Sequence, residues 1–409
     1  MTLPVKEDLR RIVLSKYFPF LFSLIVVGIV YFNELMSWPL LRFSNVFAGK
    51  NFIDLQYVLR RADCYKDIST EVYTYSIEAG WNSCFNYWYG ETLLSVLSLL
   101  RIGLVDTTAV AYVIIMIFSV TFAFSVKNLM QDNWNQFLLI NVSIILLSPI
   151  VMFLLQRGNI DLLMFSLIMF SWLLAGQGKQ TLAFGILLIG ALFKFYTLPA
   201  LFVITFYQKR KSIKVAFLIA SLITCFLVLQ SYNKVYGLQA QLTSMEQLFG
   251  FRFMSTWVQA TQSYYLNPLQ SWVIDILTFA ISFIFVMIYA KRKFELRVTP
   301  VGKYQVYLLG TIVLFIYVFG TNVDYRLTLV ASFSLFIIVQ TLTKESLNQA
   351  SRLTITISLL IALSTWLTYP SGKLQLLGDA SIAILVQIVL FILLTLVKNY
   401  SHRVKSMVK

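Results

Sequence analysis

Long apolar stretches recur from one end of this chain to the other, and they constrain its fold more than any other feature. Each stretch of roughly 17–25 residues is long enough to cross a bilayer core of about 30 Å as an α-helix. Helices are the default structure there, because backbone polar groups in lipid must be hydrogen-bonded within the protein. Of the 409 residues, 58% are hydrophobic and only 12% are charged. The sequence therefore predicts an all-α, polytopic membrane protein whose first partner is the lipid bilayer.

We expect about 12 transmembrane helices within a single membrane domain that covers residues 1–409. The expected spans are Tyr17–Phe32, Trp88–Leu104, Thr107–Val126, Gln136–Leu155, Ile160–Ala175, Thr181–Phe206, Val215–Gln230, Ser271–Ala290, Val306–Gly320, Leu327–Thr343, Thr354–Tyr369 and Ala380–Val397. The chain shows no tandem repeat, low-complexity tract or appended soluble domain.

Lysine and arginine gather in short loops, and this bias predicts the orientation of the chain. Under the 12-span count, four basic clusters fall on the same side of the membrane. They are Arg10, Arg11 and Lys16; Lys209, Arg210, Lys211 and Lys214; Lys291, Arg292 and Lys293; and Arg403, Lys405 and Lys409. Both termini are then cytoplasmic. The net charge of +15 is mostly explained by this topology, so we expect no nucleic-acid partner.

Two polar segments are too long to be turns, and both fall on the exported side in this topology. The first runs from about Asn33 to Tyr87 and the second from about residue 231 to residue 270. A long ordered loop of this kind is more often functional than incidental. Cys64 and Cys84 both lie in the first segment, and an exported loop in an oxidising compartment favours a disulfide between them. The alternative is two free thiols.

Charged side chains also occur within or beside the apolar stretches. An ionisable group inside a span costs about 3 kcal/mol or more unless it is paired or faces water, so each is a candidate functional residue. The candidates are Arg157, Asn159 and Asp161 at one span boundary; Lys194 deep in the sixth expected span; Asp275 a turn inside the eighth; and Asn322, Asp324 and Arg326 between the ninth and tenth.

Each of these groups also has a structural explanation. Arg157 and Asp161 are four residues apart and can pair across one helical turn. Lys194 can extend its amine toward the interface, although it lies roughly a dozen residues from either end of its span. Asp275 is interpreted as an interfacial residue. The charged residues of the "NVDYR" segment can form an ordinary interfacial pair.

The residues that are missing narrow the chemistry. The only histidine is His402, which excludes a histidine-based triad, a histidine proton relay and a histidine-rich metal site. The sequence contains neither a P-loop nor a dinucleotide-binding fingerprint. Exported carboxylates remain as candidate bases, and lysine and arginine near membrane depth remain as anion ligands. This set suits a lipid-linked phosphate whose sugar is passed to an acceptor hydroxyl.

Five segments, in a consistent order over most of the chain, carry a family resemblance. They are "FIDLQYVLRRADC" (Phe52–Cys64), "FNYWYGETLL" (Phe85–Leu94), "RGNIDLLMF" (Arg157–Phe165), "FKFYTLPAL" (Phe193–Leu201) and "NVDYRLTLV" (Asn322–Val330). With a first span followed at once by a long exported loop, they resemble the GT-C superfamily of polyprenyl-phosphate-sugar-dependent glycosyltransferases. Within it the likeness is closest to glycosyltransferase family 87, the polyprenol-phosphate-mannose-type mannosyltransferases.

Two positions depart from the family pattern. Trp88 stands where the family usually has proline, and Lys194 and Pro199 are further apart than in the family's Lys-x-x-Pro segment. The resemblance implies a hexosyltransferase of the cell envelope, in the inner (plasma) membrane. Such an enzyme transfers a sugar from a polyprenyl-phosphate donor to a glycan or lipid acceptor with inversion, and it requires neither a divalent metal nor another cofactor.

The resemblance also implies roles for individual residues. Asp54 matches the family's catalytic aspartate, which acts as general base on the acceptor hydroxyl, and Asp63 in the same loop is its competitor. The implied substrate-binding residues are Arg157, Asn159, Asp161, Lys194, Asn322, Asp324 and Arg326. Among them the basic residues would hold the donor phosphate, while Asn322 and Asp324 position Arg326 or bind sugar hydroxyls.

One conflict and two rival functions stay open at this stage. The 12-span count puts "RGNID" on the cytoplasmic side, away from Asp54, so either Arg157 serves another purpose or an early span is broken or re-entrant. A polysaccharide polymerase of the O-antigen type would use similar lipid-linked substrates. A flippase or transporter of lipid-linked sugars would also explain charged residues within the membrane.

Overall fold

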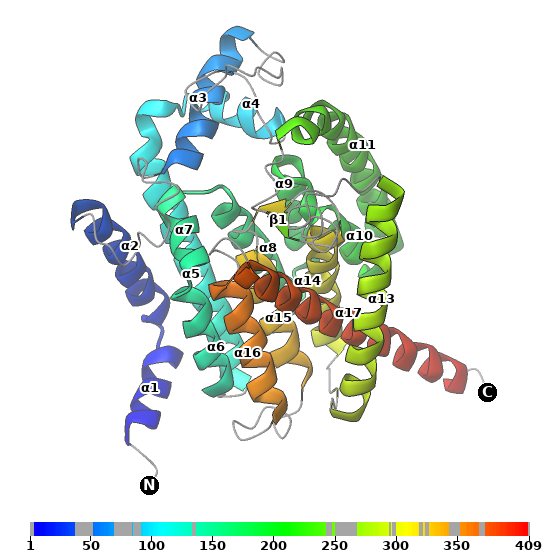
Figure 1. Ribbon diagram of the computed structural model, residues 1–409. Helices are drawn as coiled ribbons and strands as arrows, with labels where there is room; N and C mark the ends of the chain where they lie inside the picture. The colour runs from blue at the N-terminus through cyan, green and yellow to red at the C-terminus, as the bar shows by residue number, and fades with distance from the viewer. Residues whose placement is uncertain are drawn as a thin grey trace. The chain divides into compact units, whose positions relative to one another are not determined.

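The computed structural model describes most of the chain and is helical almost throughout (Figure 1). The described residues are 4–36, 52–68, 84, 91–132, 136–242, 248–249, 268–293, 296, 300–318, 322–323, 327–342, 352–367 and 373–407. They group into two compact units. Unit 1 comprises Met1–Trp134 and Met152–Thr243, and unit 2 comprises Asn135–Val151 and Ser244–Lys409. The expectation of one membrane domain stays a prediction.

Unit 1 is built around a buried helix, α5, against which α2 and α8 pack. Its helices are α1 (Pro4–Leu14), α2 (Phe18–Met36), α3 (Ile53–Ile68), α4 (Glu91–Leu99), η4 (Leu104–Asp106), α5 (Thr107–Asp132), α7 (Pro149–Arg157), α8 (Asp161–Gly176), α9 (Gln180–Phe193), η5 (Phe195–Thr197), α10 (Leu198–Tyr207) and α11 (Lys211–Leu242). The rings of Phe118 and Phe122 on α5 meet Phe165 on α8 at centroid distances of 5.0 and 5.7 Å. These contacts hold α8, which carries part of the site, against the centre of the unit.

The first long polar segment contains a helix, α3, that lies beside α4 and α5. Several contacts attach it to the rest of unit 1. Tyr65 donates a hydrogen bond to Glu91 Oε1 at 2.8 Å, and Asp63 Oδ2 accepts one from the backbone N–H of Leu104 at 2.9 Å. A disulfide joins Cys64 to Cys84, with 5.7 Å between the two Cα atoms, which is the expected separation. The predicted pairing of these two cysteines is confirmed.

Unit 2 is a second helical bundle, centred on its last helix. Its elements are α6 (Gln136–Leu146), β1 (Leu248–Phe249), α13 (Pro268–Lys293), α14 (Pro300–Val318), β2 (Asn322–Val323), α15 (Leu327–Thr341), α16 (Arg352–Trp366) and α17 (Lys373–Met407). Helices α13, α14, α15 and α16 all pack on α17, and Gly310 on α14 lets Leu393 of α17 approach closely. Strands β1 and β2 pair antiparallel, with Leu248 opposite Val323.

The described helices are those of an all-α membrane protein. Among them α5, α11, α13 and α17 are each long and apolar enough to cross a membrane alone, and α6 with α7 would make a fifth span. Seven shorter apolar helices of 10–17 residues accompany them. The count of about 12 spans stays a prediction. Asp275, interpreted as interfacial, is almost fully buried in unit 2.

The second expected span, Trp88–Leu104, is wrong as a single helix. Helix α4 ends at Leu99, Arg101 adopts a left-handed backbone with φ of 55°, and Leu104 already belongs to η4. The nine residues of α4 rise only about 14 Å, roughly half of a bilayer core. This segment therefore does not cross the membrane as one straight helix in the described residues.

The fourth and sixth expected spans are each broken. Gln136–Leu155 becomes α6 and α7, which are separated by Leu147 and Ser148 and form a bent pair. Thr181–Phe206 becomes α9, η5 and α10, with the break at Lys194. Hydropathy alone predicted continuous helices here because apolar residues continue on both sides of each break.

The disulfide gives a direct test of the pairing. Cys225, the third cysteine of the chain, is free and partly buried. We expect protein denatured without reductant to take up one maleimide adduct, and reduced protein to take up three, as measured by intact mass. A Cys64→Ser, Cys84→Ser double variant should give one adduct under both conditions. Three adducts without reductant would contradict the pairing.

Candidate functional site

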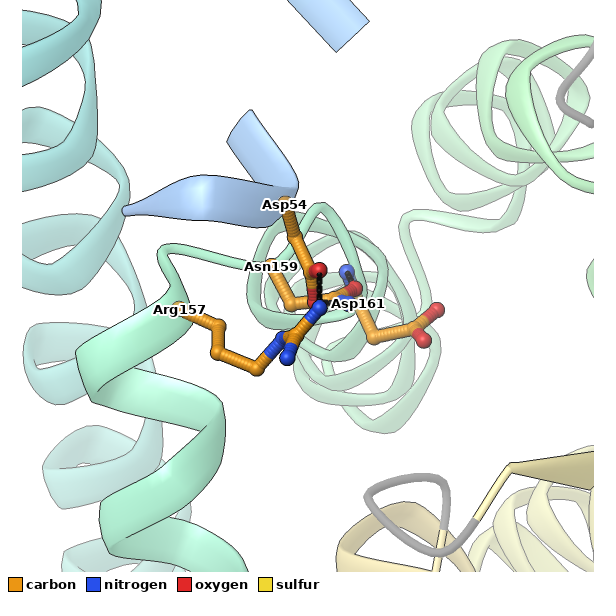
Figure 2. Close-up of polar contacts among 4 residues, drawn as sticks. All are labelled: Asp54, Arg157, Asn159 and Asp161. Atoms are coloured by element: carbon orange, nitrogen blue, oxygen red, sulfur yellow. Dashed lines mark hydrogen bonds and ion pairs between the residues drawn. The ribbon is translucent and has the colours of Figure 1, made fainter. Parts of the chain in front are cut away.

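Five of the predicted site residues lie in one connected network of polar contacts inside unit 1. The network runs from Arg157 through Asp54, Asn159 and Asp161 to Lys194, and Figure 2 shows the first four of these side chains. All five are buried: Asn159 and Asp161 are 0% exposed, Lys194 is 4%, and Asp54 and Arg157 are 7%. They come from parts of the sequence as far apart as α3 and the break after α9.

The first pair of the network joins α3 to the end of α7. Arg157 Nη2 forms an ion pair with Asp54 Oδ1. Asp54 lies in the first turn of α3 and Arg157 is the last residue of α7, so each charge lies at the helix end that favours its sign. The backbone N–H of Phe52 donates to the carbonyl of Gln156 at 2.8 Å, which brings the two helix ends together.

Asn159 connects the two acids. Its Nδ2 donates to Asp54 Oδ2 at 2.6 Å, and its Oδ1 accepts the backbone N–H of Asp161 at 2.9 Å. The second bond is the local turn that asparagine commonly forms with the residue two positions on. Gly158 makes the approach possible, since its φ is +59° and a Cβ there would lie 3.1 Å from Phe52 Cδ1. "RGN" thus turns the chain sharply between α7 and α8.

Lys194 enters the network from the break in the sixth expected span. Its extended backbone separates α9 from η5, and its Nζ forms an ion pair with Asp161 Oδ1 at 2.6 Å. After the break, the Thr197 hydroxyl donates back to the carbonyl of Leu187 at 3.2 Å, and Pro199 lies in the first turn of α10, where its missing N–H costs nothing. The break therefore brings a cation to the start of α8.

The network is electrically balanced. It holds two carboxylates and two cations, and each acid is in contact with one cation. Burying an isolated charge costs several kcal/mol, whereas a paired and hydrogen-bonded charge recovers much of that cost. Figure 2 shows the carboxylate of Asp161 pointing away from that of Asp54, so the two acids do not face each other. Each cation also lies near an aromatic ring, Arg157 near Phe153 and Lys194 near Tyr196.

These contacts correct three sequence-based interpretations. Arg157 and Asp161 form ion pairs with Asp54 and Lys194, not the expected pair across one helical turn. Lys194 is buried at a helix break, so the interpretation that it extends to the interface is wrong. The third correction concerns topology, because the 12-span count separated Arg157 from Asp54 by the thickness of the bilayer.

The short α4 resolves that conflict. If Trp88–Leu104 does not cross the membrane, one crossing fewer separates Asp54 from Arg157, and both fall on the same side. The ion pair between the two residues requires this arrangement. Two residues that touch cannot be a bilayer apart, so contact geometry outweighs a span count based on hydropathy.

The competing base, Asp63, has a different environment. It lies on the exposed side of α3, and its Oδ2 accepts the backbone N–H of Leu104. A Cβ at Gly103 would lie 2.1 Å from Asp63 Oδ1, so the carboxylate packs closely against this turn. Asp63 therefore anchors the entry to η4 and lies outside the buried network described above.

The remaining predicted residues belong to unit 2. The backbone of Asn322 is part of β2, opposite Phe249, while Asp324 and Arg326 lie outside the described residues. Sequence reasoning missed Arg61, which is 1% exposed and has its guanidinium 3.4 Å from the centre of the Tyr57 ring. The spacing of Asp54, Tyr57 and Arg61 at i, i+3 and i+7 is the signal that places them on one helix face. It also missed the buried Asp379 on α17, a single acid in an apolar stretch.

Comparisons with models of protein families, with curated proteins and with solved structures found no match. Within the described residues, no group of three or more histidine, cysteine, aspartate or glutamate side chains is arranged to hold a metal ion. The chemistry of the site is therefore inferred from its own residues. They offer one carboxylate at a helix start, two cations suited to an anionic group, and an amide that orients both acids.

The ion pair between Lys194 and Asp161 can be tested by stability. Lys194→Met keeps the side-chain length but removes the cation that faces a fully buried carboxylate, so we expect it to lower the free energy of unfolding by about 3–5 kcal/mol. The Lys194→Met, Asp161→Asn double variant should recover most of this loss, because no buried charge is then left without its ion-pair partner. Thermal unfolding of purified protein measures both. Equal losses in the single and double variants would contradict the pairing.

Proposed function

We propose that the protein is a membrane glycosyltransferase of the GT-C type, a hexosyltransferase that uses a polyprenyl-phosphate sugar as donor and a glycan or lipid hydroxyl as acceptor. The observation that carries this proposal is the contact of Asp54 with Arg157 in a buried network that also contains Lys194. A carboxylate suited to accept a proton lies beside cations suited to hold a phosphate. Mannose is the sugar that the resemblance to family 87 implies.

In this mechanism the sugar lies between Asp54 and the two cations. Asp54 accepts the proton of the acceptor hydroxyl, whose oxygen attacks the anomeric carbon from the face opposite the phosphate. The bond from that carbon to the phosphate oxygen breaks and the configuration inverts. Arg157 and Lys194 stabilise the negative charge that develops on the leaving phosphate. These fixed cations supply the charge stabilisation without a metal ion.

The proposed topology places the reaction at the exported face of the inner membrane. Helix α2 leads the chain out, α3 and α4 stay there, and α5 followed by the broken α6 and α7 returns the chain to Arg157. Both termini remain cytoplasmic only if a second expected span also fails to cross. We assign this to α9, η5 and α10, because the turn at Lys194 lets the basic cluster that starts at Lys209 return to the cytoplasmic side.

Accessibility labelling tests this topology. In a Cys225→Ser background, we expect Leu100→Cys, which is exposed after α4, to react with a membrane-impermeant maleimide from the exported side. The 12-span alternative puts the same position on the cytoplasmic side. Lys209→Cys serves as the matched control, since it is cytoplasmic in both topologies. Labelling of Leu100→Cys from the cytoplasmic side alone would rule out the proposed path.

A second candidate function is supported by the same broken helices. Secondary transporters bind substrates and ions where interrupted spans leave charged groups within the membrane. The breaks before α7 and at Lys194, with ion pairs at both, also fit a flippase of lipid-linked sugars. A polysaccharide polymerase would differ from the proposed enzyme only in its acceptor, a lipid-linked glycan. Formation of a glycosidic bond separates both enzymes from the flippase.

The decisive assay follows radiolabelled sugar from a polyprenyl-phosphate donor to an acceptor, using the purified protein. We expect Asp54→Asn to reduce transfer by at least about 100-fold, because the general base is lost. Asp67→Asn, which removes an exposed carboxylate from the same helix, is the matched control and should transfer at the wild-type rate. Full transfer by Asp54→Asn would remove Asp54 as the base. Uptake of labelled lipid-linked sugar into sealed vesicles without bond formation would favour the flippase.

A further inference from the structure

We propose that Arg157 changes partner during the reaction: it leaves Asp54 as that residue takes up the acceptor proton, and it binds the departing phosphate. This inference rests on the proposed function and goes beyond it. It makes one side chain responsible for coupling the protonation of the base to the charge on the leaving group. The argument uses the contacts of Asp54, the position of Arg157 and the charge balance of the reaction.

Both oxygens of Asp54 are engaged in the ligand-free structure. Arg157 pairs with Oδ1, and Asn159 Nδ2 donates to Oδ2 at 2.6 Å. Only 9% of each ion-paired side chain is exposed, so water provides little screening of the pair. An arginine held by a buried carboxylate is not fully available to another anion, because the two anions compete for the same guanidinium.

The reaction moves one unit of negative charge. The donor is a phosphodiester with one negative charge, and Asp54 begins with another. When the acceptor O–H bond breaks, its proton goes to Asp54, which becomes neutral. The anomeric carbon gains a bond to the acceptor oxygen, and the electron pair of its broken bond goes to the phosphate, which becomes a dianion. The total charge of the site is unchanged, while one negative charge has passed from Asp54 to the phosphate.

Arg157 is the cation whose partner loses its charge in this step. Lys194 is paired with Asp161, which takes no proton in the mechanism and whose ion pair is therefore retained. Arg157 is the last residue of α7 and precedes Gly158, so its guanidinium extends from a helix end. With five N–H donors in a planar fork, arginine can contact a carboxylate and a phosphate in turn, which a single ammonium does less well.

The inference predicts how strongly the lipid product binds. Asp54→Asn mimics the protonated base, so it frees Arg157 for polyprenyl phosphate. Full-length protein in lipid nanodiscs should bind radiolabelled polyprenyl phosphate about tenfold or more tightly in the Asp54→Asn variant than in the wild type. In an Arg157→Gln background, Asp54→Asn should give no such gain, because the cation that it frees is absent.

Controls separate this effect from a general change in charge. Asp67→Asn removes one negative charge from the exposed side of α3 and should leave the affinity for polyprenyl phosphate unchanged. Asp54→Ser, a second neutral variant, provides the same test if Asp54→Asn does not fold. Each variant is compared by gel filtration and thermal unfolding before binding is measured.

The outcomes distinguish the inference from the function on which it rests. An unchanged or weaker affinity in Asp54→Asn overturns the exchange of partners, and so does a gain that persists in the Arg157→Gln background. If the wild type still transfers sugar in those cases, the glycosyltransferase proposal stands without the exchange. If the wild type transfers no sugar and no variant binds polyprenyl phosphate, both proposals fall.

Discussion

The ion pair between Asp54 and Arg157 is the interaction on which the proposed site depends. It connects α3, in the long polar segment after the first apolar helix, to the junction of α7 and α8. Neither charge could be buried alone at an acceptable cost in free energy. Because Asn159 then binds the second oxygen of Asp54 and the backbone of Asp161, this one pair positions most of the network.

Helix ends provide the charges of the site, and this follows from the constraints of an apolar environment. A continuous transmembrane helix satisfies its own backbone and can present side chains only from its surface. A broken helix frees backbone groups and redirects side chains inward, provided that neighbouring groups satisfy what is freed. Gly158 and Lys194 mark two such points, and at both the polar side chains bond to one another inside unit 1. Breaks of this kind are found where membrane proteins bind polar substrates.

The same network fits transfer and transport for a common physical reason. Both functions need fixed charges that can exchange partners with an anionic lipid head group, and balanced ion pairs meet that need at low cost in the absence of substrate. Transfer needs one group more, a base beside the cations, and Asp54 meets this requirement geometrically. The three other residues of the network then orient the base or hold the phosphate, so each has a defined task.

The sequence by itself determined the helical membrane character, because apolar run length and helix satisfaction are local properties. It also identified Asp54, Arg157, Asn159, Asp161 and Lys194 as candidates, since charge in an apolar context is visible residue by residue, and it paired Cys64 with Cys84. It could not decide which charges meet. Residue spacing favoured Arg157 with Asp161, whereas the fold pairs each with a residue 103 or 33 positions away. Only the tertiary structure decided these partners and the helix breaks, because both depend on contacts between segments that no local pattern encodes.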